Sequence, residues 1–196
     1  MLGSALIIII GYLLGSIPFG LLLSRAAGLG DIRKIGSGNI GATNVLRTGN
    51  KGIAALTLVC DVLKGLAPVL LGRWMGGAFD PVWGGFAALL GHVFPIWLAF
   101  KGGKGVATAA GILFGWNWML ALIVLGTWIC VFAASRISSL SALSAIVVAI
   151  VASWFVAPDY FWPVTAIGLV VALTHHANIR RLFAGTEPKS NFSKTA

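Results

Sequence analysis

The stretch VATAAGILFGW, residues 106–116, decides how many times this chain crosses a lipid bilayer. A spanning α-helix needs about 20 apolar residues, so this run is short when it is taken alone. Longer apolar runs lie on both sides of it, at 4–24, 53–72, 82–100, 117–134, 138–157 and 160–175. The positions of the charged residues settle whether the short run also crosses.

Most of the 14 Lys and Arg residues fall in segments that separate alternate apolar runs. These residues are Arg25, Arg33, Lys34, Arg47, Lys51, Lys101, Lys104, Arg136, Arg180, Arg181, Lys189 and Lys194. They share one side of the membrane only if the chain crosses between residues 105 and 117. Because cytoplasmic loops carry an excess of Lys and Arg, the pattern predicts about seven transmembrane helices, one of them short, with the N-terminus outside and the C-terminus inside.

The composition agrees with a single all-α integral membrane domain over residues 1–196. The chain is 58% hydrophobic and 10% charged, and its mean hydropathy of +0.95 lies outside the range of soluble domains. Backbone hydrogen bonding in lipid allows only helices or closed barrels, and the sequence has no series of alternating strands for a barrel. The net charge of +9 is explained by loop topology and anionic headgroups, so we expect membrane lipids and no nucleic acid as partners.

The first long polar loop, residues 36–52, reads GSGNIGATNVLRTGNKG. It contains a G-x-G-x-x-G pattern, but that dinucleotide fingerprint requires a strand before it and a helix after it, whereas this one lies between membrane spans. The side chains still suit an anion, because they offer hydrogen bonds and an arginine that can hold phosphate through two parallel bonds. The candidate ligand-binding residues are Ser37, Gly38, Asn39, Thr43, Asn44 and Arg47. An ordinary glycine-rich turn with a basic flank is the alternative.

A second polar element, GHVFPIWLAFKGGKGVAT, covers residues 91–108. Its Lys-Gly-Gly-Lys-Gly segment precedes a helix-forming run, so free backbone amides, the positive end of a helix dipole and two ammonium groups would converge on an anion. The predicted phosphate-binding residues are Lys101, Gly102, Gly103, Lys104 and Gly105. A flexible basic turn at the membrane surface is the alternative. His92, inside the preceding span, is either functional or a packing residue.

A third polar segment, SRISSLSAL at residues 135–143, brings hydroxyl groups to the membrane edge. Its serines are Ser138, Ser139 and Ser141. Serines often cap helices, which is the alternative to ligand binding.

A fourth polar segment, THHANIRRLFAGTEPK, covers residues 174–189. His175 and Asn178 are three residues apart, so they share one face of a helix. The two arginines that follow Asn178 are expected to face lipid headgroups. Glu187 is expected to hold a basic partner in a structural role.

Asp61 and Lys64 lie three residues apart within one predicted span. This spacing allows an ion pair that lowers the cost of burying both charges, so we expect a structural pair. The histidines and carboxylates elsewhere show no ligand spacing of the zinc type, and no metal site is predicted.

Taken together and in this order, GSGNIGATNVLR, DVLKG, GHVFPIWLAFKGGKGVAT and HHANIRRLFAGTEPK resemble the bacterial acyl-phosphate:glycerol-3-phosphate acyltransferase family over nearly the whole chain. The resemblance implies a multi-span enzyme of the bacterial cytoplasmic (inner) membrane, with its active site facing the cytoplasm. It would move a fatty acyl group from acyl phosphate to the 1-hydroxyl of sn-glycerol 3-phosphate, giving lysophosphatidate and phosphate, the first step of phospholipid synthesis. The implied partners are these two substrates and membrane lipids, with no cofactor and no obligate protein partner.

The resemblance also implies roles for individual residues. The residues on which the family's catalytic groups fall are Ser37, Arg47, Lys104, His175 and Asn178. The family's phosphate loop falls on residues 102–105, and its third-motif glutamate falls on Glu187. Ser139 is the best match in the serine segment, where Ala142 stands in place of another expected hydroxyl. His176 does not meet the spacing of the family's histidine.

The chemistry of these residues agrees with that expectation. Both substrates carry phosphate, which accounts for two anion-binding loops, and the acyl chain accounts for a site at the membrane. Which loop holds which substrate stays open, as does whether His175 or the donor phosphate accepts the proton. Two other functions also remain. An anion transporter predicts polar residues through the depth of the bundle or inverted repeats, and a membrane assembly subunit leaves the polar loops without a ligand.

Overall fold

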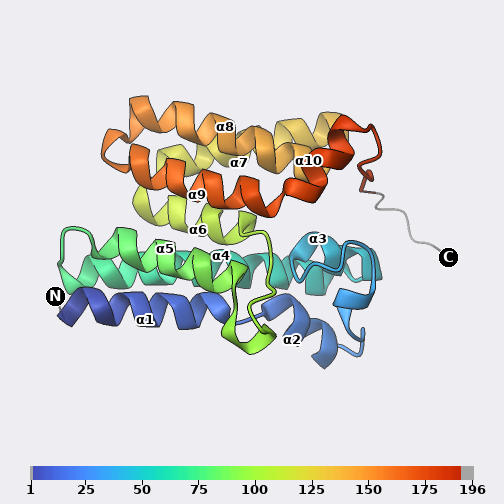
Figure 1. The fold of residues 1–196 in the computed structure, drawn as a ribbon, viewed down its shortest axis with the longest axis horizontal. Coiled ribbons are helices and arrows are strands. Elements are labelled where there is room, and N and C mark those ends of the chain that lie inside the picture. The colour runs from blue at the N-terminus through green and yellow to red at the C-terminus, as the bar shows by residue number, and fades with distance from the viewer. Residues whose placement is uncertain (1, 191–196) are drawn as a thin grey trace.

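The computed structural model describes residues 2–190, and every regular element in this range is helical (Figure 1). The α-helices are α1 (Leu2–Ser16), α2 (Phe19–Ala26), α3 (Ala42–Val45), α4 (Lys51–Met75), α5 (Asp80–Val93), α6 (Val106–Trp116), α7 (Trp118–Ser135), α8 (Ser138–Val156), α9 (Phe161–Thr174) and α10 (His176–Phe183). Short 3-10 helices cover Ile32–Lys34, Leu46–Thr48, Ile96–Leu98 and Pro158–Tyr160. Lys194, which entered the topology prediction, lies outside the described residues.

The helices have the length and composition of membrane spans. Within residues 2–190, the stretches long and apolar enough to cross a bilayer are Gly3–Ala26, Lys51–Met75, Asp80–Leu98, Trp118–Ser135 and Ser138–Val156. Two shorter apolar stretches, Val106–Trp116 and Pro158–Thr174, complete the bundle. The short run on which the topology prediction depends therefore forms α6. Leu63 and Val151 are exposed on the outside, as expected of helices that face lipid.

Two prolines change the predicted helix boundaries. The run 4–24 was expected as one helix, but the chain breaks at Pro18 into α1 and α2, because proline lacks an N–H donor and disfavours helical geometry in the residue before it. The run 82–100 was also expected to be helical throughout, but its α-helix ends at Val93, two residues before Pro95. Both stretches are still long and apolar enough to cross a bilayer, as Gly3–Ala26 and Asp80–Leu98, so the predicted spans are confirmed and each has a break near its proline.

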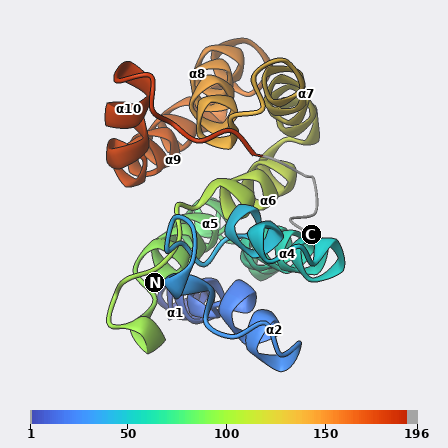
Figure 2. The same ribbon diagram turned by 90° about the vertical axis from the view of Figure 1, so that its right-hand side faces the viewer.

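The helices form two groups with α6 between them (Figure 2). α1, α2, α4 and α5 lie on one side, and α7, α8, α9 and α10 lie on the other. Glycines let α4 and α6 approach closely. A methyl group on Gly111 would overlap the carbonyl of Val62, and one on Gly65 would overlap the carbonyl of Thr108. This close packing makes α6 part of the first group while it also borders the second.

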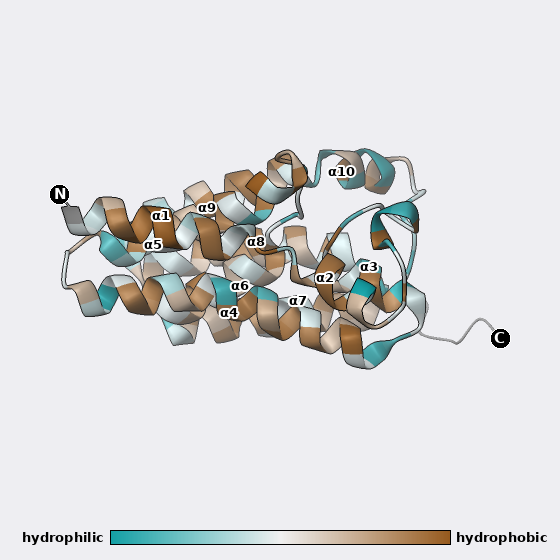
Figure 3. Cartoon of the chain, turned by 90° about the horizontal axis from the view of Figure 1, so that it is seen from below, coloured by the Kyte–Doolittle hydropathy of each residue, from teal (hydrophilic) through white to brown (hydrophobic). Residues whose placement is uncertain are grey.

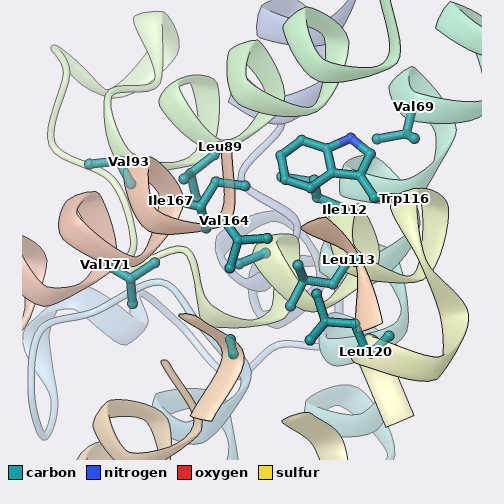
Figure 4. Close-up of a cluster of buried hydrophobic side chains, with 14 residues drawn as sticks. Val69, Leu89, Val93, Ile112, Leu113, Trp116, Leu120, Val164, Ile167 and Val171 are labelled. Atoms are coloured by element: carbon teal, nitrogen blue, oxygen red, sulfur yellow. The ribbon is translucent and has the colours of Figure 1, made fainter. Parts of the chain in front are cut away.

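An apolar core fills the space where α4, α5, α6, α7, α8 and α9 meet (Figure 4). Leu89, Ile112 and Leu120 are fully buried in it. Trp116 anchors one end of α6, because its indole Nε1 donates to the carbonyl of Pro81 at 3.0 Å and its ring stacks on Tyr160 with centroids 5.2 Å apart. The core joins the two groups of helices and so fixes the positions of the loops at their ends.

Polar segments gather at one end of the bundle, where α3 and α10 lie (Figure 3). The connections from α2 to α4, from α5 to α6 and from α7 to α8 lie at this end, whereas the turns after α4, α6 and α8 lie at the other end (Figure 1). A small apolar cluster packs beneath the first polar loop and consists of Leu21, Ile32, Ile40, Val45 and Ala54. The alternating direction of the helices thus brings four distant polar segments together.

Candidate active site

One cavity of about 1060 Å³ lies at the polar end and extends between the two groups of helices. Its polar lining comes from all four polar segments and includes Ser37, Arg47, Lys104, Ser139 and His175. Apolar side chains from α4, α6, α7, α8 and α9 line the rest. The four segments singled out in the sequence therefore share one site.

Asn44 holds the first polar loop in shape. Its Nδ2 donates to the carbonyls of Ile32 and Asn39 at 2.7 and 2.8 Å, and its Oδ1 accepts from the N–H of Ser37 at 3.2 Å. The residue is 2% exposed. Asn44 was predicted to bind ligand, but its amide is already used within the loop, so we assign it to the loop's conformation.

Gly38 and Asn39, also predicted to bind ligand, differ in their positions. Gly38 has a φ of +68°, which favours glycine, and it lies outside the cavity lining. Asn39 lines the cavity, and its Oδ1 accepts from the N–H of Gly41 at 2.9 Å. Asn39 therefore keeps its amide nitrogen for another partner.

Ser37, Thr43 and Arg47 form an open wall of the cavity. Arg47 is exposed, lines the cavity and has no hydrogen-bond or ion-pair partner among residues 2–190. Its side chain passes so close to Gly36 that a methyl group there would overlap it. Thr43 Oγ1 lies 3.3 Å from Ser138 Oγ, which joins this wall to α8. The guanidinium is therefore available to an anion.

The second polar loop is fixed to the end of α5 through its backbone. The N–H of Gly102 donates to the carbonyl of Val93 and that of Gly103 donates to the carbonyl of His92, each at 3.0 Å. Neither glycine lines the cavity. Their amides were expected to bind phosphate, but they hold the loop against α5 instead.

Lys104 is the charged member of this loop that reaches the site. Lys101 is exposed and lies outside the cavity lining, in contrast to the prediction, whereas Lys104 and Gly105 line it. Lys104 Nζ donates to Asn178 Oδ1 at 2.6 Å. Burial lowers the pKa of Lys104, and the carboxylate of Glu187 opposes this shift.

Glu187 accepts three hydrogen bonds on the opposite wall. Its Oε1 accepts from Ser139 Oγ at 2.6 Å and from Asn178 Nδ2 at 2.5 Å, and its Oε2 accepts from Arg181 Nε at 2.6 Å. Burial alone would raise the pKa of Glu187, but these hydrogen bonds outweigh it and lower the pKa. The expectation that Arg181 faces lipid headgroups is wrong, because its guanidinium turns to this carboxylate.

His175 follows the last residue of α9 and lines the cavity with a defined tautomer. Its Nδ1 lies 2.7 Å from the carbonyl of Val171, which can only accept, so Nδ1 carries the proton and Nε2 is unprotonated in the neutral ring. Burial lowers the pKa of His175 to about 4, although the hydrogen bond to Val171 opposes this. Thr174 Oγ1 donates to the carbonyl of Lys104 at 3.0 Å and so ties the end of α9 to the second loop.

The remainder of the cavity is apolar and runs along the helices. Its lining includes Leu58, Val62, Leu113, Phe114, Trp128, Ile129, Ala145, Ala149, Val164 and Ile167. A mainly apolar lining, continuous with a polar end, suits a molecule that has an anionic head and a hydrocarbon chain.

Comparison with known proteins decides the family. The profile described as glycerol-3-phosphate acyltransferase matches residues 5–185. The chain belongs to the glycerol-3-phosphate acyltransferase family. A glycerol-3-phosphate acyltransferase of Mesorhizobium japonicum is 56% identical over 191 residues, covering 95% of this chain and 96% of the relative. Its counterpart in Erythrobacter litoralis is 54% identical over 182 residues, covering 92% of each.

Solved structures agree with the family assignment. The crystal structure of PlsY (YgiH), an integral membrane glycerol 3-phosphate acyltransferase, in its glycerol 3-phosphate form is similar with a TM-score of 0.90 and 35% identity over 96% of both chains. The lysophosphatidic acid form of PlsY (YgiH) is similar with a TM-score of 0.86 and 34% identity, over 95% of this chain and 94% of that chain. The protein is therefore a multi-pass integral membrane glycerol-3-phosphate acyltransferase of the PlsY type.

Two residues of the acyltransferase site were not predicted from the sequence. Arg181 lines the cavity and binds Glu187, and Thr174 contacts the second loop. Arg181 lies three residues after Asn178, so the shared helix face was a signal that could have found it. The position of Thr174 next to His175 carried no comparable signal.

The expected ion pair of the acyltransferase, Asp61 with Lys64, is present and buried. Lys64 Nζ lies 2.8 Å from Asp61 Oδ1 and also donates to the carbonyl of Ile17 at 2.8 Å. His92 Nδ1 lies 3.8 Å from the same Asp61 oxygen. In the described part of the chain, no three His, Cys, Asp or Glu side chains lie together as metal ligands would.

Proposed function

We propose that this protein transfers a fatty acyl group from acyl phosphate to the 1-hydroxyl of sn-glycerol 3-phosphate, giving 1-acyl-sn-glycerol 3-phosphate and inorganic phosphate. The observation that supports this most is a cavity that is cationic at one end and mainly apolar along the rest. The cationic end suits the phosphates of donor and acceptor. The apolar part suits the acyl chain, so one cavity accommodates the whole reaction.

Arg47 and Lys104 bind the phosphate groups in this proposal. They lie on two different loops around the same cavity, so their positive charges converge on one volume. Ser37 adds a hydroxyl beside Arg47. Charge-assisted hydrogen bonds from these groups also stabilise the negative charge that develops as the phosphate leaves.

His175 and Asn178 orient the acceptor. The hydroxyl oxygen of glycerol 3-phosphate attacks the carbonyl carbon of the acyl phosphate and forms the ester bond. The bond between that carbon and the oxygen bridging to phosphorus breaks, and inorganic phosphate leaves with the bridging oxygen. Nε2 of His175 and the oxygen of the donor phosphate are the two groups that can accept the hydroxyl proton. Because the donor brings its own leaving group, the step needs no cofactor, and the enzyme contributes mainly position and charge.

We also propose how the protein is oriented in the membrane. Seven crossings place the N-terminus outside and the C-terminus in the cytoplasm, with the cavity mouth on the cytoplasmic side. The exposed basic residues Arg25, Lys34, Arg47 and Lys101 belong to loops at the cavity end, which supports this orientation by the positive-inside rule. The acyltransferase then receives both phosphorylated substrates from the cytoplasm of a bacterium.

An anion transporter is less well supported than an acyltransferase. Polar lining is concentrated at one end of the cavity, whereas a passage would need polar groups through the depth of the bundle. A non-catalytic assembly subunit leaves the cavity itself without a role.

Reconstituted protein with acyl phosphate and labelled glycerol 3-phosphate tests the proposal. The expected result is labelled lysophosphatidate, with one phosphate released for each ester formed. Arg47→Ala and Lys104→Ala are expected to lower turnover or acceptor affinity strongly, and Lys101→Ala is the matched control because Lys101 lies outside the cavity. Absence of ester formation by folded wild-type protein would contradict the proposal.

A further inference from the structure

A cluster of buried charged and polar side chains lies between the two polar loops and has no part in the proposed chemistry. It consists of Asp61 and Lys64 on α4 and His92 on α5, whose side chains are 3%, 2% and 4% exposed. Ionisable residues inside a membrane bundle are costly and mark functional positions. The contacts on each side of this cluster indicate what it does.

On one side, the cluster supports the second polar loop. The ring of His92 lies directly against Gly103, where a methyl group would overlap Nε2 and Cε1 of the imidazole. The backbone carbonyl of His92 also accepts from the N–H of Gly103 at 3.0 Å. The imidazole of His92 thus packs against Gly103, the residue that precedes Lys104, and supports it.

On the other side, the cluster supports the first polar loop. Lys64 Nζ donates to the carbonyl of Ile17 at 2.8 Å, at the break between α1 and α2, and lies 5.7 Å from the ring centroid of Phe19. Gly20 in α2 packs so tightly on the carbonyl of Ile40 that a methyl group would overlap it. Lys64 therefore fixes the helix on which this loop rests.

Asp61 joins the two sides. Its Oδ1 lies 2.8 Å from Lys64 Nζ and 3.8 Å from His92 Nδ1. Nδ1 of His92 has no hydrogen-bond partner in the described part of the chain, and both Asp61 and His92 line the cavity. The Asp61 carboxylate thus lies between Lys64, which supports the first polar loop, and His92, which supports the second.

We propose that Asp61, Lys64 and His92 are positioning residues that set the distance between the two phosphate-binding loops, with His92 acting on Lys104 through Gly103. The proposal rests on the phosphate-binding roles proposed for Arg47 and Lys104. It assigns to the cluster an effect on acceptor affinity rather than on the chemical step. The groups that face the cluster are the ring of Phe19, the Ile17 carbonyl and the Gly103 backbone.

A double-mutant cycle on His92 and Gly103 tests this directly. Gly103→Ala is expected to raise KM for glycerol 3-phosphate about tenfold with a smaller change in kcat, because the new methyl group displaces the loop from the imidazole. His92→Ala is expected to raise KM about threefold. In the double variant the methyl group occupies the space left by the ring, so KM is expected to return to about the value of His92→Ala alone.

Matched measurements separate this inference from its alternatives. Wild-type turnover with acyl phosphate tests the proposed function. Calorimetric measurement of glycerol 3-phosphate affinity in the same four proteins, without acyl phosphate, tests the positioning role separately. His176→Ala, at an exposed histidine outside the cavity, is the control and is expected to leave KM unchanged. If His92→Ala does not fold, His92→Asn takes its place in the cycle. Effects of the two substitutions that simply multiply, in folded variants with unchanged melting temperature, would overturn the proposal.

Discussion

The two walls of the cavity differ in how completely their polar groups are bonded within the protein. On the wall formed by α8 and α10, Glu187 binds Ser139, Asn178 and Arg181, and Asn178 in turn binds Lys104. On the wall formed by the first polar loop, the guanidinium of Arg47 has no partner in the described part of the chain.

This difference separates preorganised groups from groups that a ligand completes. The Glu187 wall holds Asn178 and Lys104 in place before substrate binds, so the enzyme does not have to order them during the reaction. The Arg47 wall presents a free cation whose partner is expected to be the substrate. Damage to the Glu187 wall should therefore affect both stability and turnover, whereas removal of the free Arg47 guanidinium should affect affinity alone.

Removal of Glu187 is expected to have the largest effect. Glu187→Ala leaves three donors without their acceptor in a largely buried site, which costs about 2–4 kcal/mol of stability and lowers activity by about 100-fold or more. A thermal melt in detergent, together with the turnover assay, measures both. An unchanged melting temperature in the variant would show that this wall does not depend on the carboxylate.

Arg47 is expected to affect affinity without affecting stability. Arg47→Ala removes charge-assisted hydrogen bonds to phosphate, so KM for glycerol 3-phosphate should rise about 30-fold while the melting temperature stays at the wild-type value. Arg47→Lys keeps the charge but loses the two parallel hydrogen bonds, so its KM should lie between those of the wild type and Arg47→Ala. If the melting temperature of Arg47→Ala fell as far as that of Glu187→Ala, the two walls would not differ in their contribution to stability.

Asn44 and Thr43 sharpen the comparison within the first loop. Asn44→Ala removes an amide that binds two carbonyls and an N–H, so we expect a loss of about 2 kcal/mol and a raised KM. Thr43→Val, at an exposed neighbour, is the control and should change stability by less than about 0.5 kcal/mol. Equal effects would mean that Asn44 does not organise the loop.

The pH dependence of stability is the smallest expected effect. Burial lowers the pKa of His175 to about 4 in the folded protein, below the ordinary histidine value of 6.5, so the unfolded chain binds a proton more readily than the folded protein. Stability is therefore present above pH 6.5 and is lost as pH falls towards 4, by about 1 kcal/mol between pH 7 and 5.5. Glu187, whose pKa is lowered, stays ionised over this window. The melting temperature of the wild type should fall between pH 7 and 5.5, whereas that of His175→Asn should change much less over the same window.

Sequence patterns predicted the helical bundle well because the spans follow from hydropathy and charge. The run 106–116 is helix α6. The breaks at Pro18 and Pro95 were missed because apolar residues continue on both sides of each proline, and hydropathy does not register a backbone break.

The composition of the site was only partly predictable. Motif chemistry identified Arg47, Lys104 and His175, all of which line the cavity. It did not separate residues that face the ligand from residues that hold a loop. The amide of Asn44 can be directed to the loop's own backbone or to a ligand, and the ammonium group of Lys101 into the cavity or away from it. Those directions depend on tertiary packing. The apolar part of the cavity was also invisible in the sequence, since it is formed between helices that are apolar on every side.

In the proposed acyltransferase, one cavity holds phosphate at its polar end and the acyl chain along its apolar part. Ala149→Phe places a larger side chain in the apolar part, far from the phosphate-binding loops, and Val151→Phe on the outer face of the same helix is the matched control. The measurement is the ratio of kcat/KM for a long-chain acyl phosphate to that for butyryl phosphate. Ala149→Phe is expected to lower this ratio about tenfold or more, and Val151→Phe is expected to leave it unchanged. An unchanged ratio in folded Ala149→Phe protein would contradict the claim.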